Sequence, residues 1–265
     1  MAFRREQRGG LMAGGTSRTG RLIQNLWFPA TVGVLWEWAA AQGWLNPFFF
    51  PPPSKILATG WTMVVGGEVA RILGVTLGRF AVGAALGSLA GIACGALMGI
   101  SGTARRALEP MIAGLYATPK LALLPLFFLL MGLGEAPKIT LIALVGFIFL
   151  STQTLDAIRG VKPSYVEMAR NYGAGRRALL RRVYLPAALP QIFTGLRIAV
   201  SRSLVVAISL ELVSGTNGLG GLIWISWETL ATERLYVGIL LAAGLGVVIH
   251  RGFGVMETRL VPWRS

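Results

Sequence analysis

Six long runs of apolar residues, separated by polar, glycine-rich or proline-rich stretches, set the pattern of this sequence. A helix needs about 20 apolar residues to cross a bilayer, with a range of about 17–25. Because lipid offers no hydrogen-bond partners, such a run must satisfy its backbone groups internally, as a helix does. We therefore predict an all-α, polytopic membrane protein with six transmembrane helices, at residues 26–44, 72–100, 107–131, 139–155, 192–213 and 235–255.

Prolines interrupt the third run. Pro119 and Pro125 lie inside it, and Lys120 directly follows the first. An interior proline removes a backbone hydrogen bond and clashes with the preceding turn, so we expect the helix to break here. Broken helices at membrane depth are tolerated where they line a cavity, and a lysine that faces lipid is costly. Pro119, Lys120 and Pro125 are therefore candidates for lining a pathway, and snorkelling of Lys120 to the interface is the alternative.

The second run carries a strict four-residue glycine repeat. Residues four apart lie on one face of a helix, so this face has no side chains. Small residues let a second membrane helix approach the backbone closely. We predict helix packing within the chain along this face, with a seam between two copies as the alternative; its members are Gly83, Gly87, Gly91, Gly95 and Gly99.

The fifth run contains ionisable residues, which inside a span are functional candidates by default. Arg197, Arg202 and Glu211 are candidates for the pathway, and a structural ion pair is an equal alternative for Glu211. Arg79, in the second run, is a further candidate, with a packed position as its alternative. A turn-rich stretch at residues 214–221 follows Glu211 and is predicted to be a flexible loop.

Composition agrees with a membrane protein. The 265 residues are 54% hydrophobic and 14% charged, whereas soluble domains carry about 25% charged residues. The mean hydropathy is +0.64 and the formal net charge is +14. The basic residues flank the apolar runs and do not form one solvated face. We therefore attribute them to orientation in the bilayer and expect no nucleic-acid partner.

The distribution of basic residues predicts the sidedness. If residues 1–25 form a cytoplasmic tail, the inner segments hold five basic residues in this tail, two at 105–106, seven from 159 to 182 and three from 251 onward. The outer segments hold four in total. Since cytoplasmic loops are rich in Lys and Arg, both termini are expected on the cytoplasmic side.

The residues exclude several kinds of chemistry. The sequence has one cysteine, Cys94, and one histidine, His250, so neither a disulfide nor a His/Cys metal site is expected within one chain. It also lacks the Gly-x-x-x-x-Gly-Lys-Ser/Thr phosphate loop that would hold ATP. We expect no catalytic residues, no metal and no cofactor bound by this chain.

A polar, arginine-rich segment at residues 159–190 separates two apolar runs. Pro163 and Ser164 are expected to start a short helix, with Ser164 as its cap and Glu167 as the capping-box partner. Gly173 and Gly175 permit a sharp turn, residues 176–184 form a second helix, and Leu185 and Pro186 are expected to stop it. The predicted result is a compact helical surface that needs a partner.

The spacing within this segment resembles the cytoplasmic coupling loop of ABC importer permeases. That pattern is Glu-Ala-Ala, three residues, Gly, nine residues, an aliphatic residue, one residue and Leu-Pro. Met168 departs from it, because it replaces the first Ala. The matching positions are Glu167, Ala169, Gly173, Val183, Leu185 and Pro186.

Further segments resemble the nitrate/sulfonate/taurine branch of the same family, over roughly residues 26–264. They are Pro110, residues 119–126, Gly132 to Glu135, Leu189 and Pro190, Gly195 to Arg197, and Glu211 with Gly218 to Gly220. The resemblance implies a type I ABC importer permease-like fold for residues 26–265. It also implies a permease subunit for a small anionic solute of the sulfonate, taurine or nitrate type.

The resemblance implies partners too. The coupling loop would dock on a separate ABC ATPase, present in two copies, which uses the ATP. An extracytoplasmic binding protein would deliver the solute, the permease would be a homodimer, and the location would be a bacterial inner membrane. Two alternatives stay open: import of a neutral or cationic nitrogenous compound such as a vitamin precursor, and a membrane scaffold that docks a cytosolic protein.

Overall fold

The computed structural model describes residues 18–215 and 217–260, and all regular structure in these ranges is helical. Most of the predicted basic tail, residues 1–17, lies outside the described residues. The chain divides into two parts, Met1–Ala58 and Thr59–Ser265, which are described separately.

The first part contains helix α1, Arg18–Ala41, and the start of α2, Pro53–Val65. Residues 18–25 of the predicted tail are therefore helical. Near the end of α1, the carboxylate of Glu37 accepts hydrogen bonds from the backbone N–H of Ser54, at 2.9 Å, and from its hydroxyl, at 2.8 Å. These two bonds attach the first turn of α2 to α1.

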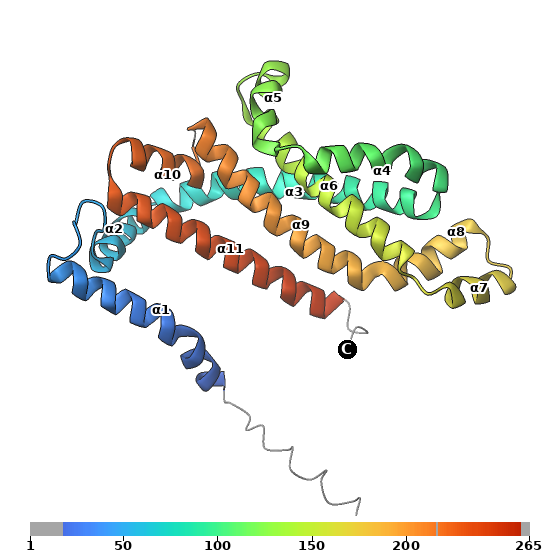
Figure 1. Ribbon diagram of the computed structural model, residues 1–265, viewed down its shortest axis with the longest axis horizontal. Helices are drawn as coiled ribbons and strands as arrows, with labels where there is room; N and C mark the ends of the chain where they lie inside the picture. Colours follow the sequence, from blue (N-terminus) through green and yellow to red (C-terminus); the bar gives the residue numbers. More distant parts are fainter. Residues whose placement is uncertain (1–17, 216, 261–265) are drawn as a thin grey trace, which may run out of the picture. The chain divides into compact units, whose positions relative to one another are not determined.

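The second part holds four long helices and several short ones (Figure 1). The long helices are α3 (Glu68–Ile100), α6 (Glu135–Arg159), α9 (Leu185–Ser214) and α11 (Thr232–Leu260). The short ones are α4 (Gly102–Ala117), η1 (Lys120–Leu123), α5 (Leu124–Met131), α7 (Pro163–Asn171), α8 (Arg176–Leu179), the π-helical turn η2 (Leu180–Tyr184) and α10 (Leu219–Glu228).

The glycine repeat of α3 lies against α6. A Cβ atom at Gly87 would lie 2.1 Å from the carbonyl oxygen of Ala143, and one at Gly95 would lie 2.4 Å from that of Ser151. Both obstacles are backbone atoms, which cannot rotate away. The repeat therefore brings the two backbones into direct contact within one chain, as small residues do in membrane helix pairs.

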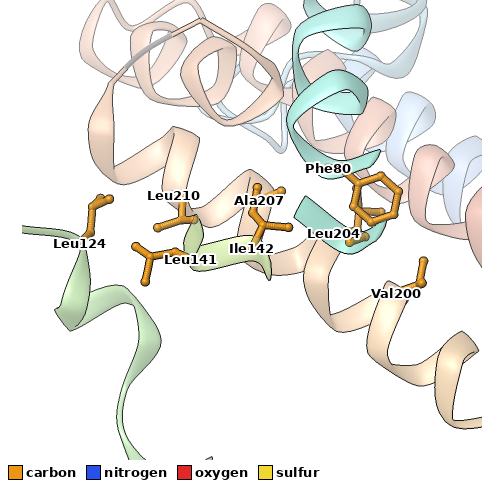
Figure 2. Close-up of a cluster of buried hydrophobic side chains, with 9 residues drawn as sticks. Phe80, Leu124, Leu141, Ile142, Val200, Leu204, Ala207 and Leu210 are labelled. Atoms are coloured by element: carbon orange, nitrogen blue, oxygen red, sulfur yellow. The ribbon is translucent and has the colours of Figure 1, made fainter. Parts of the chain in front are cut away.

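Helix α9 also packs against α6 and runs antiparallel to it. Gly195 approaches Gln153, near the end of α6, whereas Ser203 lies opposite Gly146, nearer its middle. Figure 2 shows the apolar core where α3, α5, α6 and α9 meet. Its buried members are Phe80, Ala84, Leu124, Leu141, Ile142, Val200, Leu204, Ala207 and Leu210.

The predicted break in the third apolar run is confirmed. α4 ends at Ala117, Thr118 is extended, and α4 and the η1–α5 pair meet at an angle of 96°. The residue before a proline avoids the α conformation, so Pro119 explains where α4 ends. Pro125 lies in the first turn of α5, where its missing N–H costs nothing.

Among the described residues, α3, α6 and α11 are long and apolar enough to cross a membrane, and the bent α4–α5 pair adds a fourth candidate. The protein is therefore a polytopic, all-helical membrane protein. The predicted spans at 26–44 and 192–213 fall on α1 and α9, and a total of six spans stays a prediction.

Candidate functional site

The predicted coupling segment forms a hairpin of short helices between the end of α6 and the start of α9 (Figure 1). α7 starts at Pro163, its N-cap residue is Lys162, and no side chain caps it. The predicted cap at Ser164, with Glu167 as its capping-box partner, is therefore wrong. Pro163 fits the first helical position because its fixed φ suits a helix and its missing N–H would have no partner there. Ser164 consequently lies two residues past the N-cap position, too far inside the helix to cap it.

Gly173 ends α7 in a left-handed conformation, with φ of +80°. The N–H of Ala174 donates to the carbonyl of Ala169 at 3.0 Å, and that of Gly173 donates to Arg170 at 2.8 Å. This pair of bonds is the Schellman motif, which favours glycine at the left-handed position. A Cβ at Gly173 would meet no atom within 4 Å, so the backbone angle and not the available space requires glycine. Ala169 supplies the carbonyl that closes the turn.

The second half of the segment differs from the prediction at Leu185 and Pro186. These residues do not stop a helix: α8, η2 and α9 follow one another with helical backbone angles throughout. The N–H of Leu185 donates to the carbonyl of Leu180, five residues earlier. A proline in a regular helix clashes with the carbonyl four residues before it. The wider π turn relieves this clash and lets the chain pass from the segment into α9 without a break.

The segment exposes large side chains. Tyr165 and Met168 of α7 are 49% and 57% exposed, and Tyr172, directly after its end, is 87% exposed, whereas Val166 is buried. Glu167 is also exposed, and it lines a cavity of ≈ 270 Å³ between α7 and the ends of α3 and α6. Exposed apolar and aromatic side chains of this kind mark interaction surfaces.

The same segment is strongly basic on its second half. Arg177, Arg181 and Arg182 are exposed and surround a shallow hollow with Gly175 and Ala178. Val183 and Leu185 are half-buried. An acidic or polar partner surface would complement this charge.

The opposite end of the bundle contains a buried charge cluster. Arg79 of α3 is 6% exposed and Glu211 of α9 is 1% exposed. Nη1 of Arg79 donates to Glu211 Oε1 at 2.8 Å, and its Nη2 donates to Glu135 Oε1, at the start of α6, at 2.7 Å. Arg79 also donates to the carbonyl of Asn217. One guanidinium therefore joins three long helices and a loop.

The second oxygen of Glu211 is satisfied as well. Thr76 donates its hydroxyl hydrogen to Oε2 at 2.8 Å, and the backbone N–H of Gly220 donates to the same oxygen at 3.2 Å. A Cβ at Gly218 would lie 2.4 Å from the carboxylate, and one at Gly220 would lie 2.1 Å from the Ile208 carbonyl. The predicted loop at 214–221 is thus shorter than expected, since α10 begins at Leu219 and its first turn packs on Glu211.

Arg197 is also paired. Its Nη1 lies 3.6 Å from Oε2 of Glu257 in α11, and Thr194 donates to the other oxygen of Glu257 at 3.1 Å. The contact joins α9 to α11. A role of Arg197 or Glu211 in a pathway stays a prediction, and the structure places both in ion pairs between helices.

Lys120 and Arg202 have different surroundings. Nζ of Lys120 donates to the backbone carbonyl of Tyr116 and lies 5.4 Å from the centre of the Tyr116 ring. The guanidinium carbon of Arg202 lies 4.4 Å from the centre of the Phe149 ring. The two rings touch edge to face, with centres 5.0 Å apart. The structure thus brings together two of the predicted pathway cations, on an aromatic pair.

The partners of Arg79 in the buried cluster were not predicted from the sequence. Thr76 was not singled out, and Glu135 was noted only as part of a family pattern. One signal was available: Arg79 lies four residues before Gly83, so it continues the glycine face that packs on α6. A charge on a packed face needs a counter-charge, which the buried Glu211 and the partly exposed Glu135 provide.

Comparisons with known proteins agree with this architecture. Residues 84–261 match the family described as "Binding-protein-dependent transport system inner membrane component". The chain belongs to this family, and it is accordingly a multi-pass inner-membrane protein. The fold resembles that of the MetNI methionine ABC transporter in an inward-facing structure, with a TM-score of 0.63 at 18% identity over 75% of this chain and 96% of that one.

Two similar proteins match this chain over about nine tenths of its length. "Taurine transport system permease protein TauC" of Escherichia coli (strain K12) is 32% identical over 241 residues, which cover 89% of this chain and 88% of that protein. "Putative aliphatic sulfonates transport permease protein SsuC" of Bacillus subtilis (strain 168) is 30% identical over 243 residues, 92% and 88% of the two chains. The predicted family and its sulfonate/taurine branch are confirmed.

Proposed function

We propose that this chain is the membrane-spanning subunit of an ATP-driven importer for a small sulfonate. The observation that carries the proposal is the α7–α8 segment: a family member presents, between two long helices, an exposed turn closed by the Schellman motif at Gly173. A surface of this shape transmits force if a partner holds it. The continuous helical path through η2 into α9 supplies a stiff connection to the bundle.

The partners follow from the same proposal. A separate ATPase subunit binds residues 159–190 on the cytoplasmic side, and an extracytoplasmic binding protein delivers the solute at the other side. The seven basic residues from 159 to 182 support this orientation, with both termini cytoplasmic. Two permease copies with two ATPase subunits supply twelve spans and two docking surfaces, which a two-fold symmetric pathway uses.

The solute class is inferred from the relatives, whose printed names specify taurine and aliphatic sulfonates. The test is reconstitution of the permease with its ATPase in proteoliposomes, with the binding protein outside. We expect ATP turnover to rise when the binding protein is loaded with taurine or an alkanesulfonate, and the labelled sulfonate to accumulate inside.

Other results would assign the chain differently. Accumulation of a nitrogenous vitamin precursor and not of a sulfonate would replace the solute class and keep the transport function. A permease that recruits a cytosolic protein but neither stimulates ATP turnover nor moves a solute would be a scaffold, and the proposal would be wrong.

A further inference from the structure

We propose that Lys120 and Arg202, held on the rings of Tyr116 and Phe149, bind the sulfonate group of the solute during its passage. The inference rests on the proposed function and adds the residues that recognise the anion. It selects two cations out of the charged residues within the apolar runs. The selection depends on which charges are already neutralised.

Three other cations in the long helices have carboxylate partners. Arg79 is paired with Glu211 and Glu135, Lys138 with Glu135, and Arg197 with Glu257. Across the described residues, neither Lys120 nor Arg202 has a carboxylate oxygen within 4.0 Å. The carboxylate Glu109 lies seven residues before Tyr116, and Asp156 lies seven residues after Phe149. Each separation corresponds to about 10 Å along a helix. Two cations thus lie together without an anion.

The two charges act on each other. Lys120 lies in electrostatic range of Arg202, and the interaction is repulsive. Repulsion between two cations is strengthened in a medium of low dielectric constant, and an anion placed between them would add two attractions that outweigh it. A cation that faces lipid is costly as well. An anion that enters from water relieves both costs, so the pair favours a negatively charged solute.

The local geometry holds the cations but leaves the site open. Phe149 is 9% exposed, whereas Tyr116 is 46% exposed and Arg202 is exposed. The ring faces attract the cations, and the carbonyl of Tyr116 fixes the ammonium group of Lys120. The four residues of the site lie in α4, η1, α6 and α9. Two of these elements, α4 and η1, lie on opposite sides of the break after Ala117. A change in the 96° angle at this break would therefore change the distance between the two cations.

A sulfonate fits this pair chemically. Its three oxygens share one negative charge, so a guanidinium can donate two parallel N–H bonds while an ammonium group takes the third oxygen. The exposed edge of Tyr116 is left for the methylene groups that follow the sulfur in taurine or an alkanesulfonate. A solute without an anionic group would leave both cations uncompensated.

The experiment uses the full transporter with its ATPase and binding protein in proteoliposomes, and radiolabelled taurine as the probe. In Lys120→Gln and Arg202→Gln we expect the KM for uptake to rise about 10- to 100-fold, because this is the effect of losing one hydrogen bond to a charged group. Lys120→Arg should restore most of the uptake. Arg106→Gln, which removes an exposed cation elsewhere, is the matched control and should behave as the wild type.

Two results separate this inference from the proposed function. If wild-type vesicles accumulate taurine and both Gln variants keep the wild-type KM, the site is wrong and the transport function stands. If the wild type moves no sulfonate, the solute class itself fails. A labelling experiment tests the site without relying on the Gln variants, which could fail to fold. In a Cys94→Ala background, the single cysteine introduced by Tyr116→Cys should react faster with an anionic thiosulfonate reagent than with its cationic analogue. An equal or reversed preference would also overturn the inference.

Discussion

Glycine has two different functions in two regions of this molecule, the α3–α6 interface and the α7–α8 segment. At Gly87 any side chain would overlap the backbone of α6, whereas at Gly173 there is open space and only the positive φ excludes other residues. In the first region, the glycine face of α3 is buried against α6. The second exposes Tyr172, Met168 and a row of arginines. The difference teaches that the bundle builds the fold and the segment presents a surface to a partner.

Substitution in the α3–α6 interface is expected to have the largest effect. Gly87→Leu should prevent the approach of the two helices and abolish the folded protein, because the blocking atoms belong to the backbone of Ala143. Overpacking costs about 1–3 kcal/mol where the neighbouring side chains can move. The cost should be larger at Gly87, because backbone atoms cannot move aside in this way. Gly78→Leu in the same helix has open space and serves as the control. The yield of monodisperse protein from detergent measures both; equal yields would contradict the assigned packing.

The next largest effect is expected at the buried charge cluster. Glu211→Ala should destabilise the protein by about 3–5 kcal/mol, since it leaves the guanidinium of Arg79 buried with one fewer counter-charge. Glu135→Ala should cost less, because Glu135 is 56% exposed. Thermal unfolding in detergent would rank the two variants. A smaller shift for Glu211→Ala than for Glu135→Ala would show that the cluster does not hold the helices together.

In the exposed segment, the expected change is functional with little loss of stability. Gly173→Ala should cost about 1–2 kcal/mol of local backbone strain, and Gly175→Ala, at an ordinary φ in open space, should cost almost nothing. We expect Gly173→Trp to insert into the membrane in normal amounts but to lose ATP-dependent uptake. Uptake at the wild-type rate in Gly173→Trp would remove this turn from the docking surface.

The smallest effect is expected at Ser164. The structure places it inside α7, so Ser164→Ala should change stability by less than about 0.5 kcal/mol, whereas loss of a true N-cap costs about 1 kcal/mol. Chemical denaturation of the purified protein can separate these values. A loss near 1 kcal/mol would restore the capping box predicted from the sequence.

The sequence predicts those features that depend on neighbours along the chain. The glycine repeat, the break at Pro119 and the turn at Gly173 all follow from spacing and residue type. The pairing of Arg79 with Glu211 joins residues 132 positions apart, so no local pattern contains it. The π turn at Leu180–Tyr184 depends on how Pro186 fits the preceding helix. The meeting of Lys120 with Arg202 depends on the angle at the break.

Photo-crosslinking in intact cells can test whether the α7–α8 segment docks on a separate ATPase. A photoreactive residue at position 172, where Tyr172 is 87% exposed, should give a covalent adduct with an ATP-hydrolysing subunit. The same probe at position 133, where Leu133 is 88% exposed at the other end of the bundle, should give none. Adducts with an ATPase from position 133 alone, or from neither position, would contradict the account.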